Sequence, residues 1–162
     1  MSTHDDNVAR GRSAKAAGDA WESWIETQFV KAEHLGIIAH WEHNEPHAKT
    51  INGRLVYTAP GVSDYTAVLD RSGLAVAIEA KSTSQNRLLR SAVEPKQQRH
   101  LNAVGRAGGV ALLVVEFRIV AQMSPHTVHE RFAVPWLKIR WEIKRTKESV
   151  GPNDLDAWHI TT

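Results

Sequence analysis

Three apolar runs that contain β-branched residues occur between residues 74 and 134. Leu74 to Ile78 predicts a buried strand, and the longer run from Val110 to Ile119 predicts a central strand covered on both faces. Phe132 to Val134 predicts a shorter strand near the end. Strands that are separated by helical stretches are typical of an α/β protein with a mixed sheet.

Helical periodicity marks the segments around these strands. From Asp19 to about His34 the apolar residues recur at helical spacing and form one stripe, which consists of Trp21, Trp24, Ile25 and Phe29. A second helix begins near Pro95, because proline favours the first turn and Leu101 gives the next turns an apolar side. A third helix is expected near the C-terminus. The pattern predicts a mixed central β-sheet flanked by helices, in one domain over residues 1–162.

Charged residues follow the first apolar run. Glu79 and Lys81 lie two positions apart on the predicted strand, so their side chains point to the same face. Asp64 lies fifteen positions before Glu79, and Arg71-Ser72-Gly73 predicts a turn between them. An antiparallel strand before this turn would bring the Asp64 carboxylate beside Glu79. The sequence therefore predicts a hairpin with two carboxylates and an amine at one end.

These three residue types suit a metal-dependent nuclease. Mg²⁺ prefers oxygen ligands, usually one or two carboxylates together with water and substrate phosphate, which fits Asp64 and Glu79. Lys81 adds a positive charge that stabilises a transition state without competing for the metal. The alternative is a solvated Glu79–Lys81 ion pair at a strand end, with Asp64 as a turn residue, since Glu-x-Lys is common. The triplet alone leaves both interpretations open.

The first predicted helix offers a further acid. Glu22 follows Gly18 by four positions, which places it in the expected first turn, from where it could reach over the sheet toward Asp64. The alternative is a solvated acid that interacts favourably with the positive end of the helix. Glu26, one turn further on, competes with Glu22 for any catalytic role.

The second predicted helix offers an amide. Gln97 and His100 are one turn apart and share a face. The Gln97 side chain could orient the attacking water or hold a phosphate oxygen. Alternatively, Gln97 is an ordinary residue of the helix surface.

Taken in order, these motifs resemble those of the RecU-type Holliday junction resolvases and, in compactness, the archaeal Hjc-type and phage resolvases of the same PD-(D/E)XK nuclease superfamily. The matching segments are Gly18-x-x-x-Glu22, Ser63-Asp64-Tyr65, Ile78-Glu79-Ala80-Lys81, Gln97-x-x-His100-Leu101, Gly109 to Val115 and Phe132 to Trp136. The resemblance implies a restriction-endonuclease-like core and a Mg²⁺ site in which Mn²⁺ can substitute. It assigns metal ligation to Asp64, Glu79 and Glu22, and further catalytic roles to Lys81 and Gln97.

The resemblance also implies a function and its partners. We expect a homodimeric, Mg²⁺-dependent endodeoxyribonuclease that resolves four-way DNA junctions by paired symmetric nicks, during recombination, repair or phage DNA processing. No small-molecule cofactor is expected. Two alternatives remain: a restriction-type or repair-type endonuclease of the same superfamily, and a noncatalytic junction-binding protein whose acids form a surface network.

Basic residues occur in several segments that DNA could contact. Residues 1–15 predict a flexible basic arm, and about 40–60 correspond to the stalk that the resembling family inserts into a junction, here short enough for a hairpin or loop. The DNA-binding candidates are Arg10, Arg12, Lys15, His43, Lys49, Arg54, Arg87, Arg90, Lys96, Arg99 and His100. The alternative is a solvated surface of mixed charge.

Composition limits these hypotheses. The chain has 162 residues, a single-domain length, and no cysteine, which excludes disulfides, thiolate zinc sites and cysteine nucleophiles. Its formal net charge of +2 does not by itself identify a DNA-binding protein. No apolar run approaches the roughly 20 residues needed to span a bilayer. We therefore expect a soluble protein of the cytoplasm, or of the host cytoplasm if the compact chain is phage-encoded.

Overall fold

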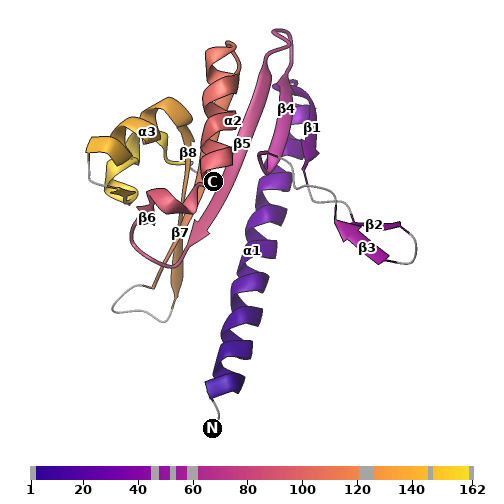
Figure 1. Ribbon diagram of the computed structural model, residues 1–162. Helices are drawn as coiled ribbons and strands as arrows, with labels where there is room; N and C mark the ends of the chain where they lie inside the picture. Colours follow the sequence, from indigo (N-terminus) through magenta and orange to yellow (C-terminus); the bar gives the residue numbers. More distant parts are fainter. Residues whose placement is uncertain are drawn as a thin grey trace.

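A five-stranded sheet forms the centre of the structure (Figure 1). The computed structural model describes residues 3–44, 48–51, 54–57, 62–120, 126–145 and 148–160. In spatial order the strands are β1 (Ile38–His43), β4 (Tyr65–Leu69), β5 (Ala75–Thr83), β7 (Val110–Val120) and β8 (Thr127–Pro135). β5 and β7 run parallel, and the other neighbours pair antiparallel, which confirms the predicted mixed sheet.

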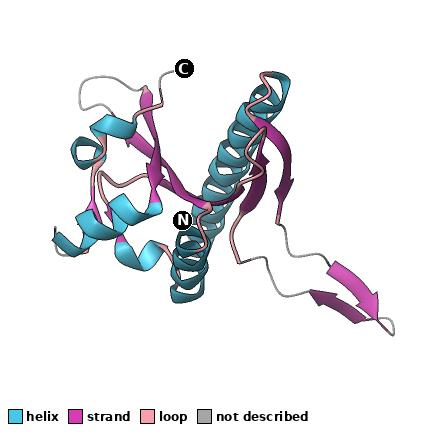
Figure 2. Ribbon diagram, turned by 90° about the horizontal axis from the view of Figure 1, so that it is seen from above, coloured by secondary structure: helices cyan, strands magenta, loops and turns pink. Residues whose placement is uncertain are grey.

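Helices cover both faces of this sheet (Figure 2). They are α1 (Thr3–His34), α2 (Pro95–Arg106) and α3 (Trp136–Arg145). On one face Ile25 of α1 packs in a hydrophobic cluster with Val76 and Ile78 of β5. On the other face Leu101 of α2 packs with Ala77, and α3 contributes to the same cluster. Successive residues of β5 thus alternate between two cores, as expected for a strand covered on both faces.

The first helix is longer than its hydrophobic stripe indicates. α1 begins at Thr3 instead of the expected Asp19. The added segment is rich in alanine, arginine and lysine, which have high helix propensity, and Gly11 and Gly18 each oppose the helix by only about 1 kcal/mol. Residues 3–15, expected as a flexible arm, therefore continue the helix. Glu22 consequently lies in the middle of α1 and not in its first turn.

Two strands extend beyond their apolar runs. β5 pairs with β7 as far as Thr83, which lies opposite Phe117. β8 pairs with β7 from Thr127 onward, and Thr127 lies opposite Val120. Backbone hydrogen bonds form whatever the side chain, so a strand that is paired along its length does not end where its apolar residues end. The strand expected at Phe132–Val134 accordingly contains nine residues.

β4 and β5 form the predicted antiparallel hairpin. Tyr65 lies opposite Ile78 in the ladder, and the connecting turn has Arg71 and Gly73 at positive φ, 59° and 65°. Of the β5 residues, only 75–78 pair with β4, so the later residues of β5 have no neighbour on that side in the ladder. The acidic end of the hairpin is therefore the point at which its two strands separate.

Two small sheets complete the described part of the fold. They pair β2 (Ala48–Ile51) with β3 (Arg54–Tyr57), and β6 (Leu88–Leu89) with β9 (Ser149–Val150). Short 3₁₀ turns span Arg90–Ala92, Pro152–Asp154 and Asp156–Trp158. The β2–β3 hairpin stands away from the main sheet in both ribbon views (Figures 1 and 2). It occupies the segment in which a short stalk-like hairpin is expected.

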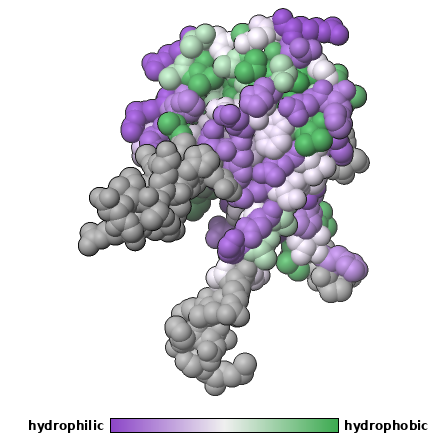
Figure 3. Space-filling view, turned by 90° about the vertical axis from the view of Figure 1, so that its right-hand side faces the viewer, coloured by the Kyte–Doolittle hydropathy of each residue, from purple (hydrophilic) through white to green (hydrophobic). Residues whose placement is uncertain are grey.

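The outer surface is mixed in polarity. The side of the molecule that carries β1 and β4 shows hydrophilic residues with small hydrophobic groups between them (Figure 3). No helix within the described ranges combines the length and the apolar character needed to cross a membrane.

Candidate active site

Asp64 and Glu79 lie side by side at the point where the two strands of the hairpin separate. Because Tyr65 pairs with Ile78, the residue before Tyr65 and the residue after Ile78 lie side by side at the open end of the hairpin. The Asp64 Oδ2 atom accepts a hydrogen bond of 2.8 Å from the main-chain N–H of Ala80. This bond fixes the Asp64 carboxylate against the strand that carries Glu79.

Glu79 is the buried centre of the site. Its side chain has no solvent exposure, and its Oε1 atom accepts a hydrogen bond of 2.6 Å from Lys81 Nζ. The Nε2 atom of Gln97 donates a second hydrogen bond to the same Oε1. The other oxygen, Oε2, is buried and has no hydrogen-bond partner among the described residues. One carboxylate oxygen is therefore held by two donors, and the other is left without any.

Burial and a like charge perturb the titration of Glu79. Burial raises the pKa of Glu79 from 4.5 to about 7, and the nearby Asp64 carboxylate contributes to the increase. The hydrogen bond and charge of Lys81 lower this pKa, but they do not compensate for burial. Near pH 7 the Glu79 carboxyl group is therefore about half protonated when no cation is bound.

Gln97 connects this centre to the start of α2. It occupies the third helical position, and its Oε1 atom accepts a 2.8 Å hydrogen bond from the main-chain N–H of Glu94, the N-cap residue. Because its Nε2 atom donates to Glu79, both ends of the amide are used. The same side chain thus caps the helix and fixes the orientation of the Glu79 carboxylate.

The Asp64–Glu79 pair fits a divalent cation. A buried carboxylate oxygen without a donor, next to a second carboxylate, requires either a proton or a cation. Within the described residues there is no group of three or more His, Cys, Asp or Glu side chains that could hold a metal ion. Two carboxylates are nevertheless sufficient for Mg²⁺, which commonly completes its coordination with water and substrate phosphate.

The expected third ligand, Glu22, lies on α1, which covers the other face of the sheet, and its role stays a prediction. Trp21 and Ile25 bury the α1 stripe against the sheet face opposite to Glu79, whereas Glu22 is exposed. The periodicity of a helix shows which residues are buried but not which face of the sheet the helix covers. Glu26, the competing acid, instead pairs with His43, whose Nδ1 lies 3.1 Å from Glu26 Oε1.

His43 is therefore part of the α1 side of the molecule. Its ring stacks on Tyr65 with 4.4 Å between the ring centroids, in addition to its contact with Glu26. The next residue, Asn44, donates from its main-chain N–H to Asp64 O at 2.8 Å and from Nδ2 to Ser63 O at 3.0 Å. Asn44, which the sequence did not single out, thus fixes the main chain that carries Asp64.

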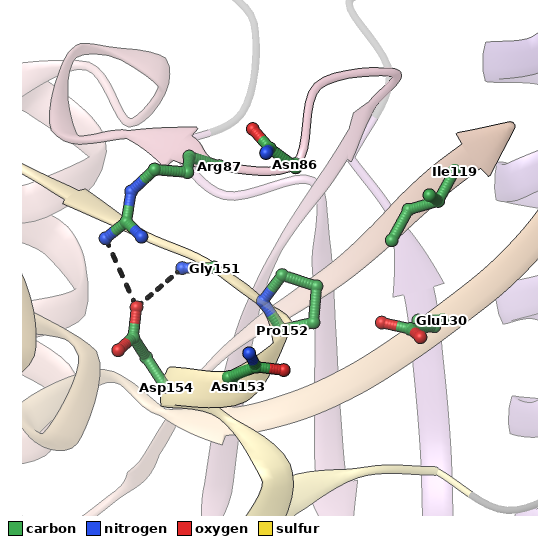
Figure 4. A pocket seen from close by; sticks show the side chains of 8 residues that line it. All are labelled: Asn86, Arg87, Ile119, Glu130, Gly151, Pro152, Asn153 and Asp154. Atoms are coloured by element: carbon green, nitrogen blue, oxygen red, sulfur yellow. Dashed lines mark hydrogen bonds and ion pairs between the residues drawn. The ribbon is translucent and has the colours of Figure 1, made fainter. Parts of the chain in front are cut away.

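Arg87 holds the C-terminal segment in place. Its Nε and Nη2 atoms donate to Ser149 at 2.8 and 2.9 Å, and Nη2 also lies 3.2 Å from Asp154 Oδ2. Figure 4 shows the Asp154 carboxylate between this guanidinium and the main-chain N–H of Gly151, which donates to it at 2.8 Å. The guanidinium thus joins two distant parts of the chain, which is a structural contribution separate from the expected DNA contact.

The other DNA-binding candidates are dispersed. Lys15 pairs with Asp19 at 3.0 Å and Lys96 with Glu94 at 3.5 Å, and these pairs are largely exposed. Arg90 and Arg99 are exposed near the start of α2, while His100 is half-buried. The side chains of Arg10, Arg12, Lys49 and Arg54 lie outside the described part of the structure.

The sequence did not indicate a second buried acid, Glu116. Glu116 is 2% exposed in the middle of β7, where it receives hydrogen bonds from Ser82, His129 and Arg131. The available signal was an acid, Glu116, and a base two positions later, Arg118, inside an otherwise apolar run. Its partners come from neighbouring strands, so they could be identified only from the strand register.

Comparison with known proteins finds one matching family and a similar solved structure. Residues 38–148 match the family RecU, described as Recombination protein U. The matched residues include Asp64, Glu79, Lys81 and Gln97 but not α1. No curated protein matches the sequence. Among solved structures, the chain is similar to Hjc, a Holliday junction resolvase from the archaeal hyperthermophile Archaeoglobus fulgidus, with 14% sequence identity and a TM-score of 0.48 over 89% of this chain and 90% of that chain.

Proposed function

Because the chain belongs to the RecU family of Holliday junction resolvases, we propose that it is a divalent-metal-dependent endonuclease that cuts four-way DNA junctions by paired, symmetric nicks. The observation that carries the proposal is the buried Glu79 carboxylate, which adjoins Asp64 and leaves one oxygen without a donor. This pair would hold Mg²⁺, and Mn²⁺ could replace it because it accepts the same oxygen ligands.

Each residue of the site has a defined task in this proposal. When bound, Mg²⁺ supplies positive charge where negative charge builds on the scissile phosphate. Lys81, whose Nζ is 2.6 Å from Glu79 Oε1, stabilises the same charge from the protein side and can hold the attacking water. Gln97 keeps the Glu79 carboxylate in one orientation, so the ligand geometry exists before substrate binds.

Glu22 has a weaker claim to a catalytic role. Its expected part as a third acidic ligand would require its carboxylate to reach past the sheet edge, because α1 packs on the face opposite to Glu79. Glu22→Gln is therefore expected to reduce cleavage much less than Glu79→Gln does.

A homodimer would match the symmetry of the substrate. Paired nicks in two opposed strands require two active sites related by an approximate two-fold axis, and most homo-oligomers are symmetric dimers. Light scattering during gel filtration should therefore give twice the 18.1 kDa mass of the chain.

The decisive experiment is cleavage of a labelled synthetic four-way junction with Mg²⁺. Paired nicks that yield ligatable duplexes should disappear with EDTA and in Asp64→Asn. Asparagine keeps an oxygen that can accept the N–H of Ala80, so this variant should fold and still bind the junction. Equal cutting of a linear duplex or a flap would instead identify a restriction-type or repair-type nuclease. Tight binding without cutting would identify a noncatalytic junction-binding protein.

A further inference from the structure

A cluster of charged residues surrounds Glu116, outside the candidate active site. The Glu116 cluster consists of Ser82, Glu116, Arg118, His129 and Arg131. Glu116 Oε1 accepts two hydrogen bonds from Arg131, both 3.1 Å, and lies 2.9 Å from His129 Nδ1. Glu116 Oε2 accepts a 3.0 Å hydrogen bond from Ser82 and is 3.9 Å from Arg118 Nε.

The strand register assembles this cluster. Ser82 of β5, Glu116 of β7 and Arg131 of β8 are successive partners across the sheet. Arg118 and His129 are paired two residues further along the same strands. Side chains two positions apart on a strand share a face, so the charged groups gather on one side of the sheet.

The Glu116 cluster lies next to the candidate active site but on the opposite face. Ser82 directly follows Lys81 on β5, and adjacent residues of a strand point to opposite faces. Trp24 of α1 marks the face of the cluster, because the Arg131 guanidinium lies 4.3 Å from the centroid of its ring. This contact orients Arg131 in advance of any ligand.

The cluster contains more positive charge than the buried carboxylate requires. One carboxylate is surrounded by two guanidinium groups and an imidazole. Arg131 donates two hydrogen bonds to Oε1 and Ser82 donates one to Oε2, so both oxygens of Glu116 have donors without Arg118. The Nε atom of Arg118 is buried without a hydrogen-bond partner in the described part of the chain, because 3.9 Å from Glu116 is too long for one. The side chains of Arg118 and His129 are 25% and 43% exposed, so an external anion can reach them.

We propose that Arg118, His129 and Arg131 form a second anion site, which binds a backbone phosphate of the junction DNA other than the scissile one. The planar guanidinium presents several donors in a geometry that matches phosphate oxygens. Each strand of duplex DNA carries one phosphate per about 3.4 Å of helix axis, so neighbouring phosphates lie close together. A backbone that crosses the end of β5 with one phosphate at Lys81 therefore brings another to the opposite face. The strand register and the Trp24 contact hold these groups in place, and the Glu116 carboxylate neutralises part of their charge. This inference rests on the proposed function.

The first test is Arg118→Gln, measured as junction affinity in EDTA, where no cutting occurs. The Kd should rise about tenfold at about 0.1 M salt, since a charge-assisted hydrogen bond is lost. The slope of log Kd against log salt should decrease by about 0.9, the value for one phosphate contact. The melting temperature should remain unchanged. Arg106→Gln, at the far end of α2, is the matched control and should alter neither quantity.

The second test predicts a gain in junction affinity instead of a loss. Glu116→Gln removes the carboxylate that competes with DNA for the cations, so the folded variant should bind the junction more tightly than the wild-type protein. A purely structural network would give a lower melting temperature and no gain in affinity. The proposal is overturned if Arg118→Gln binds like Arg106→Gln, whatever the Glu116 variant does. A wild-type protein that binds no junction would overturn the proposed function, and this site with it.

Discussion

A carboxylate that is fully buried beside another carboxylate needs a proton or a cation to compensate its charge. Glu79 meets this description, because Asp64 adjoins it and Lys81 alone does not offset the burial. With a pKa of about 7, a large fraction of Glu79 is still protonated at neutral pH, and a bound cation would displace this proton. Metal binding and proton release are therefore coupled at this residue.

The first prediction concerns stability against pH in the metal-free protein. The pKa of Glu79 is raised from 4.5 to about 7, so the folded state binds this proton more tightly than the unfolded state does. The resulting stabilisation is complete below pH 4.5, declines above it, and is lost once the pH has passed about 7. Urea unfolding in EDTA should show a loss of roughly 2 to 3 kcal/mol between about pH 5 and 8. Glu79→Gln should remove most of this dependence, and an unchanged slope in that variant would assign it to other groups.

The second prediction concerns Lys81. Lys81→Ala removes the ammonium group that is hydrogen-bonded to Glu79, so single-turnover cleavage of a four-way junction should fall at least about 100-fold. Junction affinity in EDTA should stay within a few-fold of the wild-type value. Loss of binding with cutting preserved would contradict the assigned role.

The positions of residues that are joined by a local turn were predictable from the sequence. The positions of residues that depend on pairing between distant segments were not. Asp64 and Glu79 are joined by one turn, so the sequence could place them side by side. Glu22 could not be placed, because its position depends on the sheet face that α1 covers. Arg118 and His129 meet only through the β7–β8 register, which no local signal specifies.

At the level of elements, the connection from α2 to β7 passes close to both β5 and α2 at Gly109. A Cβ atom there would lie 2.8 Å from both Ala75 O and the Cγ1 atom of Val104. Gly105, in the helix, has nothing within 4 Å of the same atom. Glycine is therefore required at the first position but not at the second.

The third prediction follows from this contrast. Gly109→Ala should reduce the free energy of unfolding by about 1 to 3 kcal/mol, because main chain must move to accept the methyl group. Gly105→Ala should raise it by about 0.5 to 1 kcal/mol, because alanine is the better helix former. Urea titration of both variants measures the difference, and equal effects would refute the close approach.

Elements whose ends are marked by specific residues in the sequence were predicted well. Pro95 marks the start of α2, and the run at Val110 gives β7 almost to its last residue. The start of α1 and the length of β8 were wrong. In α1, propensity extends the helix past the residues that pack on the sheet. In β8, pairing with β7 extends the strand past its apolar residues.

For the whole molecule, the β2–β3 hairpin is the part that stands apart from the sheet (Figure 1). Its base is closed, because Asn44 donates to Asp64 O at 2.8 Å and to Ser63 O at 3.0 Å. The two ends of the segment are therefore near each other, and a short linker can join them without disturbing the main sheet.

The fourth prediction concerns substrate preference. Replacement of residues 46–60 by a short Gly-Ser linker should leave the melting temperature nearly unchanged, since the base contacts remain. If the hairpin acts as a stalk that enters the junction, the preference for a four-way junction over linear duplex should largely disappear. Competition binding in EDTA measures this preference. A variant that still prefers the junction would place recognition on the main body.

The family assignment and the mixed sheet agree with what the sequence predicts for the whole chain. The homodimer stays a prediction, since it follows from substrate symmetry. A phage origin likewise stays a prediction that rests on compactness alone.

The parallel pairing of β5 with β7 also determines when the protein can become active. Glu79 is joined to Gln97 only after α2 has folded back along the sheet, and β5 is secured only when β7 pairs beside it. Parallel strands need a long crossover, and contacts between distant segments form late in folding. A nascent or partly folded chain can form the Asp64–Glu79 hairpin but lacks the Gln97 contact and the β7 neighbour, so we expect no nicking of DNA before the sheet is complete.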